Sequence, residues 1–311
     1  MIGILCSNEN EEIFSEKLHN LFKSTKKETD DTIIVFTILN IDFLAKTVTG
    51  SMISGKEIEL VTAPLPAVIF NFSVQLKSNC IKARKLLEDM EDVELVNNVN
   101  RFDQSMIMEI LSVSETTLKY VLPYFIYDKN IDGEKLDEYR QYIGIPLKRT
   151  SISRILYKKS DNVIDTDYYE KAHSHGLRKA AIFHRKRILL EIPELVTNND
   201  QPVVIRTYVQ REYGKRWIIL GRNVFPEYDF SKDVLMEKVN EVVLDVISYI
   251  NNYLPTLGEC FIDLLLSSDG NPYFLHLGGI GETFFELAQD EDFYKSFYKN
   301  MIKLTSYLNY A

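Results

Sequence analysis

Two side chains able to carry a proton or hold a metal lie close together near the end of the sequence. Asp263 stands in the apolar run 259–266, and His276 stands in a second apolar run that follows the turn Ser268–Pro272. An Asp-Gly pair between two such runs is a strong indication of a β-hairpin. The hairpin would let Asp263 and His276 face each other. They would be either an acid–base pair or a vestigial pair left in a former active-site cleft, and we favour the vestigial pair. Two ligands are too few to predict a zinc or manganese site.

Cations and imidazoles elsewhere offer further candidates. Lys148 and Arg206 could grip a phosphate or carboxylate ligand, or form structural ion pairs inside a sheet, and we leave both readings open. The basic run 171–187 is either an anion-binding lip or, as we favour, a solvated helical face. It contains three histidines, His173, His175 and His184. No cysteine or carboxylate completes a metal site near them, so a solvated loop is the favoured interpretation.

The N-terminal part of the sequence is predicted to alternate between strands and helices, which favours a parallel α/β layer. The predicted strands are 1–6, 32–39, 67–72 and 93–97, the predicted helices are 11–23 and 80–90, and a hairpin is expected over 50–59. We assign residues 1–98 to a small Rossmann-like domain without a glycine-rich dinucleotide turn. Residues 99–311 form the second domain, with a smaller lobe at about 125–190 and a C-terminal lobe at about 191–311.

Within the second domain, Asp103 is placed to cap a helix that runs through Leu111. Residues 142–148 and 153–159 are predicted to pair as strands, and 188–190, 203–210 and 216–220 to be strands of another sheet. Long helices are expected over 233–253 and 291–308.

The composition is that of an ordinary globular protein. The chain has 311 residues, of which 45% are hydrophobic, enough to bury a large core. A net charge of −9 argues against nonspecific binding to nucleic acid, which needs a cationic surface. No run approaches the 18 apolar residues of a membrane span, and no signal peptide is recognisable. Cys6, Cys80 and Cys260 are expected to be buried free thiols, which together with these features predicts a cytoplasmic protein.

Several segments, taken in order, resemble the YheC/YheD family, a spore-coat-associated branch of the ATP-grasp superfamily. They are Ile2-Gly3-Ile4-Leu5, Pro64-Leu65-Pro66-Ala67-Val68-Ile69-Phe70-Asn71, Arg101-Phe102-Asp103-Gln104 with Glu109-Ile110-Leu111, Ile205-Arg206-Thr207-Tyr208-Val209-Gln210 with Gly214 and Trp217, and the final Tyr310-Ala311. The resemblance spans nearly the whole chain. It implies an α/β protein in which an ATP-grasp fold follows a small Rossmann-like domain.

Carried over by this resemblance, the nucleotide site is altered at several positions. Gln104 stands where the family has a phosphate-binding lysine, whereas the second phosphate lysine resembles Lys148. The family's glycine-rich phosphate loop becomes 149–154, which has no glycine, although Arg149 and Arg154 offer charge to an anion. Glu191 would accept hydrogen bonds from the ribose. Two further departures are Val204 in place of an Asp and Phe72 in place of an Arg.

The magnesium site is altered more severely. The family uses an Asp on one strand and Glu-x-Asn at the end of the next, and here Asp263 is followed by His276 and Gly278. Magnesium requires hard oxygen ligands, so Asp263 alone is a poor site and magnesium binding is doubtful. Residues 278–281 are expected to form a flexible glycine turn, which could instead bind an anion through its backbone N–H groups. Three acidic residues beyond it could replace the missing ligands if that turn folds inward, namely Glu282, Glu286 and Asp290.

The leading functional hypothesis is therefore a catalytically degenerate ATP-grasp protein that serves as a scaffold or partner subunit, binding a peptide or an active paralogue. One alternative is a working carboxylate–amine ligase with a rearranged site, in which Arg206 and His276 are the catalytic candidates, Lys148 binds phosphate and Asp263 the metal. Another is a sensor that binds ATP without magnesium. Spore-coat association follows from the resemblance alone.

Overall fold

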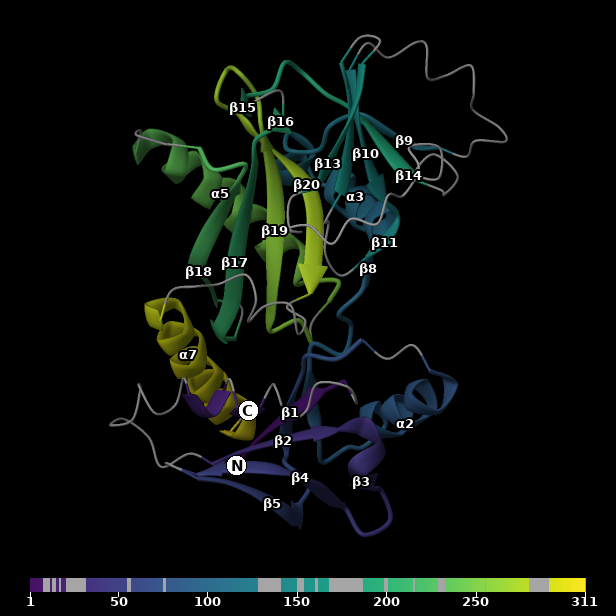
Figure 1. Ribbon diagram of the computed structural model, residues 1–311, viewed down its shortest axis with the longest axis vertical. Helices are drawn as coiled ribbons and strands as arrows, with labels where there is room; N and C mark the ends of the chain where they lie inside the picture. The colour runs from purple at the N-terminus through teal and green to yellow at the C-terminus, as the bar shows by residue number, and fades with distance from the viewer. Residues whose placement is uncertain are drawn as a thin grey trace.

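The computed structural model describes most of the chain, and its secondary structure is organised around three main sheets (Figure 1). The described residues are 1–7, 12, 15–16, 18–20, 32–54, 57–74, 77–127, 141–149, 154–159, 162–167, 187–198, 201–214, 216–228, 233–254, 256–279 and 291–310. The histidine-bearing run 171–186, the loop 150–153 and the acidic residues of 280–290 lie outside this set, so the hypotheses that concern them stay predictions.

The N-terminal sheet has a parallel core with an antiparallel extension. Its strands in spatial order are β3 (Ile41–Asp42), β4 (Thr47–Ser54), β2 (Ile33–Thr37), β1 (Ile2–Cys6), β6 (Val68–Asn71) and β7 (Glu94–Val96), and β5 (Glu57–Pro64) pairs with β4. Strands β2, β1, β6 and β7 run parallel, which confirms the predicted α/β layer. The 3-10 helix η1 (Ile38–Asn40) follows β2, and α2 (Ser78–Glu88) connects β6 to β7. Cys80 and Leu87 of α2 belong to the apolar cluster under one face of this sheet.

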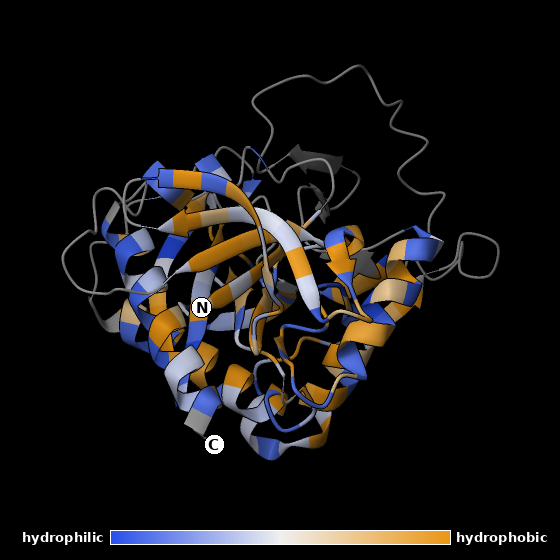
Figure 2. Ribbon diagram, turned by 90° about the horizontal axis from the view of Figure 1, so that it is seen from below, coloured by the Kyte–Doolittle hydropathy of each residue, from blue (hydrophilic) through white to orange (hydrophobic). Residues whose placement is uncertain are grey.

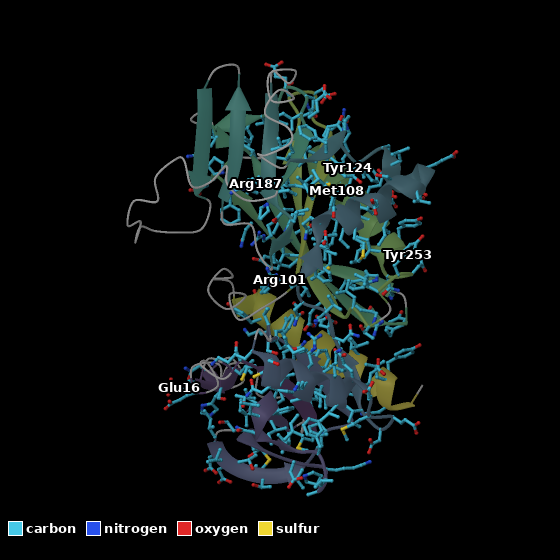
Figure 3. All side chains as sticks on the ribbon, turned by 90° about the vertical axis from the view of Figure 1, so that its right-hand side faces the viewer. Glu16, Arg101, Met108, Tyr124, Arg187 and Tyr253 are labelled. Atoms are coloured by element: carbon cyan, nitrogen blue, oxygen red, sulfur yellow. The ribbon has the colours of Figure 1, made fainter. Side chains whose placement is uncertain are left out.

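A connection through Asn97–Arg101 leads into the upper part of the molecule. There β8 (Phe102–Asp103) precedes α3 (Gln104–Val113) and α4 (Glu115–Leu118). The Asp103 side chain accepts a hydrogen bond from the backbone N–H of Ser105, which confirms the predicted helix cap. Figure 3 shows Arg101 at the level where the lower and upper parts meet, with Met108 and Tyr124 above it.

The smaller of the upper sheets is antiparallel. Its order is β13 (Asn162–Asp167), β12 (Arg154–Lys159), β10 (Gln141–Pro146), β14 (Arg187–Glu191) and β9 (Tyr124–Tyr127). The predicted pairing of 142–148 with 153–159 is confirmed by the contact of β10 with β12. Residues 188–190, however, pair with β10 and β9 and not with the strands at 203–220, so that assignment was wrong. A buried apolar strand can pair with either sheet, and its own sequence does not say which.

The second upper sheet holds the candidate site. Its antiparallel order is β18 (Arg216–Phe225), β17 (Val204–Tyr213), β19 (Glu259–Leu266) and β20 (Pro272–Gly279). The hairpin β19–β20 turns at Ser268–Asn271, as the Asp-Gly signal predicts. Two further short strands, β15 (Thr197–Asn198) and β16 (Gln201–Pro202), pair with each other, and β11 (Lys148–Arg149) pairs with β8.

Two long helices flank this sheet. Helix α5 (Asp233–Ile250) contributes Val239, Val243 and Ile247 to the large apolar core on one face. Helix α7 (Glu291–Tyr310) contacts β17 and lies between the four-stranded sheet and the N-terminal sheet in Figure 1. Polar and apolar residues alternate along the helices in Figure 2, as expected for helices with one buried side. No helix among the described residues is long and apolar enough to cross a membrane. All three cysteines are buried thiols that form no disulfide, as expected.

Candidate active site

Strand register brings three chemically capable side chains together on one face of the four-stranded sheet. Asp263 of β19 pairs with Arg206 of β17 on one side and with His276 of β20 on the other. Because residues opposite each other in an antiparallel pair point to the same face, the three side chains meet. We call Arg206, Asp263 and His276 the buried charge cluster.

The dominant contact in this cluster is a two-pronged ion pair. Arg206 Nε donates to Asp263 Oδ1 at 2.6 Å, and Nη2 donates to Oδ2 at 2.7 Å. Both carboxylate oxygens are therefore bound by one guanidinium, the geometry in which Arg binds carboxylates most strongly. His276 Nδ1 lies farther away, 3.4 Å from Asp263 Oδ2. The sequence predicted the Asp263–His276 contact, but the main partner of Asp263 is Arg206.

The cluster is closed to water. Asp263 is 1% exposed, and Arg206 and His276 are fully buried. The Phe261 ring covers the guanidinium, with its centroid 3.7 Å from Arg206 Cζ. Burial raises the pKa of Asp263, but the charge and hydrogen bonds of Arg206 outweigh it and hold this pKa below its usual value. Asp263 is therefore an ionised, neutralised carboxylate and a poor candidate for a general acid or base near neutral pH.

These residues do not fit a magnesium ion. Magnesium needs several oxygen ligands in near-octahedral geometry, and both oxygens of Asp263 already accept from Arg206. His276 supplies nitrogen, and the described residues contain no group of three His, Cys, Asp or Glu side chains that could hold a metal. Asp263 thus lies on β19, and the described residues around it do not supply the oxygen partners that a metal requires.

Gly278 shows why the last expected metal ligand has no counterpart. A Cβ atom built on Gly278 would lie 1.9 Å from Phe261 Cζ, because Phe261 is the cross-strand partner of Gly278. The aromatic ring thus fills the space that a side chain at position 278 would need. Gly278 and Gly279 are also part of strand β20, so the expectation of a turn beginning at 278 was wrong. Close packing against Phe261 demands a residue without a side chain, and the strand continues through it.

Gln104 has a structural role that its sequence position did not reveal. Its side-chain Nε2 donates to the carbonyl oxygen of Leu277 at 2.9 Å, and its Oε1 accepts from the Leu277 N–H at 3.0 Å. The amide thereby satisfies both backbone groups of Leu277 as a neighbouring strand would. Lysine has no acceptor, so it could not make this pair of bonds.

The other nucleotide-site candidates lie on three strands, β11, β12 and β14. The backbone of Lys148 pairs with Asp103, and that of Arg149 with Phe102, which puts Lys148 beside the start of α3. Arg154 begins β12, and the side chains of Lys148, Arg149 and Arg154 lie outside the described part. Glu191 is exposed at the end of β14, and its N–H donates to the carbonyl oxygen of Pro123.

Comparison with known structures places this arrangement in a recognised fold. The D-alanine–D-alanine ligase from Coxiella burnetii aligns with a TM-score of 0.56 and 10% identity, covering 98% of this chain and 93% of the ligase. The VanG D-Ala:D-Ser ligase from Enterococcus faecalis gives 0.56 and 10%, covering 98% of both chains. The ATP-grasp ligase PsnB, solved with precursor peptide PsnA2 and AMPPNP, gives 0.53 and 12%, also covering 98% of both.

The fold is ATP-grasp. The expected fold class is thereby confirmed over nearly the full length of the chain. At 10–12% identity these likenesses establish the fold alone, and catalytic residues are not transferred by them. No known protein family and no curated protein matches the sequence. The YheC/YheD resemblance therefore stays a prediction.

Sequence reasoning missed Phe261, which covers the buried charge cluster, and the structural role of Gln104. The signal for Phe261 was present in the hairpin, because a register that puts Asp263 beside His276 also puts residue 261 beside Gly278. Gln104 gave no such signal, since its partner Leu277 lies 173 residues away in the sequence.

Proposed function

We propose that this chain is an ATP-grasp-fold protein that has lost magnesium-dependent ligation and acts by binding a partner. The observation that carries the proposal is the two-pronged Arg206–Asp263 pair, in which both oxygens of the Asp263 carboxylate accept from a guanidinium that neutralises its charge. Phosphoryl transfer in ATP-dependent enzymes relies on metal ions to neutralise developing charge. Asp263 is buried and its charge is already neutralised, and a phenylalanine ring fills the side-chain space at Gly278. These residues therefore do not hold a metal ion that could neutralise developing charge.

A peptide or an active ATP-grasp paralogue is the partner class we propose. The ATP-grasp ligase PsnB was solved with its precursor peptide, so this fold accommodates peptides in at least one protein. The resemblance to YheC/YheD proteins, with its spore-coat association, belongs to this proposal, as does the cytoplasmic location expected from the composition. So does the division into residues 1–98 and 99–311, the second with lobes at about 125–190 and 191–311. ATP itself is a possible ligand through Lys148 and Glu191, with Arg149 and Arg154 nearby in sequence.

Calorimetric titration with ATP, with and without magnesium, tests the proposal directly. We expect no heat that depends on magnesium at millimolar ATP. Lys148→Ala is the variant that removes the retained phosphate lysine, and Lys82→Ala on the exposed surface of α2 is its matched control. Magnesium-dependent binding lost in Lys148→Ala but kept in Lys82→Ala would replace the proposal by the ligase alternative. Binding that is indifferent to magnesium would identify a nucleotide sensor instead.

The partner is tested separately by measuring ligation by a paralogous ATP-grasp enzyme with and without this protein. A rise in the paralogue's rate that survives Lys148→Ala supports a partner subunit. No change at saturating concentrations would remove the paralogue from the proposal.

A further inference from the structure

A fully buried carboxyl group lies where the four-stranded sheet meets the N-terminal sheet. Glu259 is the first residue of β19 and has no solvent exposure. Its neighbours are Gln210 of β17, Gly258, and Asn97, which follows β7. We call Asn97, Gln210, Gly258 and Glu259 the junction cluster.

Backbone contacts hold this junction tightly. Asn97 adopts a left-handed conformation with φ of 59°, and its Oδ1 accepts from the N–H groups of Gly258 at 2.7 Å and Glu259 at 3.1 Å. The Asn97 N–H donates to the carbonyl oxygen of Thr256 at 2.7 Å. A Cβ atom at Gly258 would lie 2.2 Å from Val96 Cγ1, so the Val96 side chain packs directly against the backbone of Gly258. The carboxyl of Glu259 is therefore enclosed by the contact between the two parts of the molecule.

The hydrogen bonds around this carboxyl are incomplete if it is ionised. Gln210 Nε2 lies 3.3 Å from Glu259 Oε2, a long contact for a charged acceptor. Glu259 Oε1, Gln210 Oε1 and Asn97 Nδ2 are buried and have no hydrogen-bond partner among the described residues. A protonated carboxyl can donate to an amide oxygen, and Gln210 can turn its oxygen toward Glu259 to receive that proton. Protonation thus replaces a long contact to a buried charge with a hydrogen bond between two neutral groups.

The charges that face Glu259 do not cancel this preference. Burial raises the pKa of Glu259 to about 8, although the hydrogen bond from Gln210 and the charge of Arg211 act to lower it. Arg211 on β17 is itself shared with Glu94 of β7 and Tyr307 of α7. Cys260, the next residue of β19, has its pKa raised by burial and by Glu259.

We propose that Glu259 is a proton-operated latch between the N-terminal sheet and the four-stranded sheet, closed by a bound proton and weakened when that proton leaves. A carboxyl exposed by opening of the junction ionises as an ordinary Glu does, whereas the closed junction favours the neutral acid. Closure is therefore strongest in mildly acidic solution and weakens as the pH rises toward 8. This device is independent of the function proposed above, because the junction cluster includes no residue of the candidate active site.

Amide hydrogen exchange of the junction segments tests the latch. We expect the protection of peptides spanning 94–100 and 256–262, corrected for intrinsic exchange rates, to fall about tenfold per pH unit between pH 5 and pH 8. Glu259→Gln keeps the shape and cannot ionise, so its protection should not depend on pH. Glu91→Gln, at an exposed position outside the junction cluster, is the matched control and should keep the wild-type slope.

A second measurement keeps the test decisive if exchange is limited by global unfolding. The Glu259 carboxyl carbon, identified by its absence in Glu259→Gln, should titrate near pH 8 in carbon-13 spectra of the intact protein. Titration near 4.5, or an equal pH slope of protection in wild type and Glu259→Gln, would overturn the proposal.

Discussion

Removing one partner of the Arg206–Asp263 pair should destabilise the protein far more than removing both. Arg206→Met leaves the Asp263 carboxylate buried at 1% exposure with no guanidinium, and Asp263→Leu leaves the guanidinium equally stranded. An uncompensated buried charge of this kind costs about 3–5 kcal/mol of unfolding free energy. The double variant Arg206→Met/Asp263→Leu buries no charge, and we expect its stability within about 1 kcal/mol of wild type, or higher. Methionine also keeps a favourable sulfur contact with the Phe261 ring.

Urea denaturation of the four proteins at pH 7 gives these free energies by linear extrapolation, and the two single variants and the double form a thermodynamic cycle. Lys303→Met is the matched control, because Lys303 makes a 2.6 Å ion pair with Glu212 while 44% exposed. Exposed pairs contribute only about 0–1 kcal/mol, so this variant should be nearly neutral. If the single variants at Arg206 or Asp263 also left the unfolding free energy unchanged, the existence of a buried ion pair would be refuted. A double variant as unstable as the sum of the singles would refute the neutralisation argument.

The same pair has a defined pH dependence. The folded-state pKa of Asp263 is depressed below its ordinary value of 3.8, since Arg206 outweighs burial. Its contribution is therefore present above pH 3.8 and lost as the pH falls through the depressed value. The double variant should lack this component of acid unfolding.

Three further perturbations follow from the closed site and the junction. Gly278→Ala puts a methyl group into the Phe261 ring and should cost roughly 1–3 kcal/mol by urea denaturation, part of it recovered by adding Phe261→Leu. Gln104→Leu strands both backbone groups of Leu277 and should cost roughly 2–5 kcal/mol, whereas Gln104→Lys should be no better and should not create ATP binding by calorimetry. Relative to Glu259→Gln, wild-type stability should fall by about 5 kcal/mol between pH 4.5 and pH 8 and stay constant above, because the folded-state pKa is raised from 4.5 to about 8 at roughly 1.4 kcal/mol per pH unit. An equal pH dependence in wild type and Glu259→Gln would contradict this last expectation.

The sequence predicted secondary structure well where a turn or a helix cap is specified by residues that are close together in the chain. The Asp269-Gly270 turn fixed the hairpin of β19 with β20, and the hairpin register then brought Asp263 to His276. Asp103 capped α3 for the same local reason. These features are written within a few residues of one another, so reading them needs no knowledge of the tertiary structure.

The contacts that define the chemistry of the site are nonlocal. Arg206 reaches Asp263 only because β17 pairs with β19 in a register that spans 57 residues of sequence. Gln104 was interpreted as a lost phosphate contact, yet its amide completes the backbone of Leu277. A residue that differs from an expected motif thus indicates which group is missing, and only the folded neighbourhood shows what that residue does instead.

His276 and Gly278, where the resemblance implies metal ligands, are linked physically to the ion pair. A buried Asp263 without a metal ion needs another cation, and Arg206 is the cross-strand neighbour that supplies it. Gly278 leaves room for Phe261, whose ring then lies on the guanidinium and excludes water from it. A glutamate at position 276 alone would bring a second carboxylate beside Asp263 with one guanidinium between them, while Phe261 would still fill the place of the third ligand. Replacing His276 alone would therefore not supply the oxygen-lined metal site that the resemblance implies.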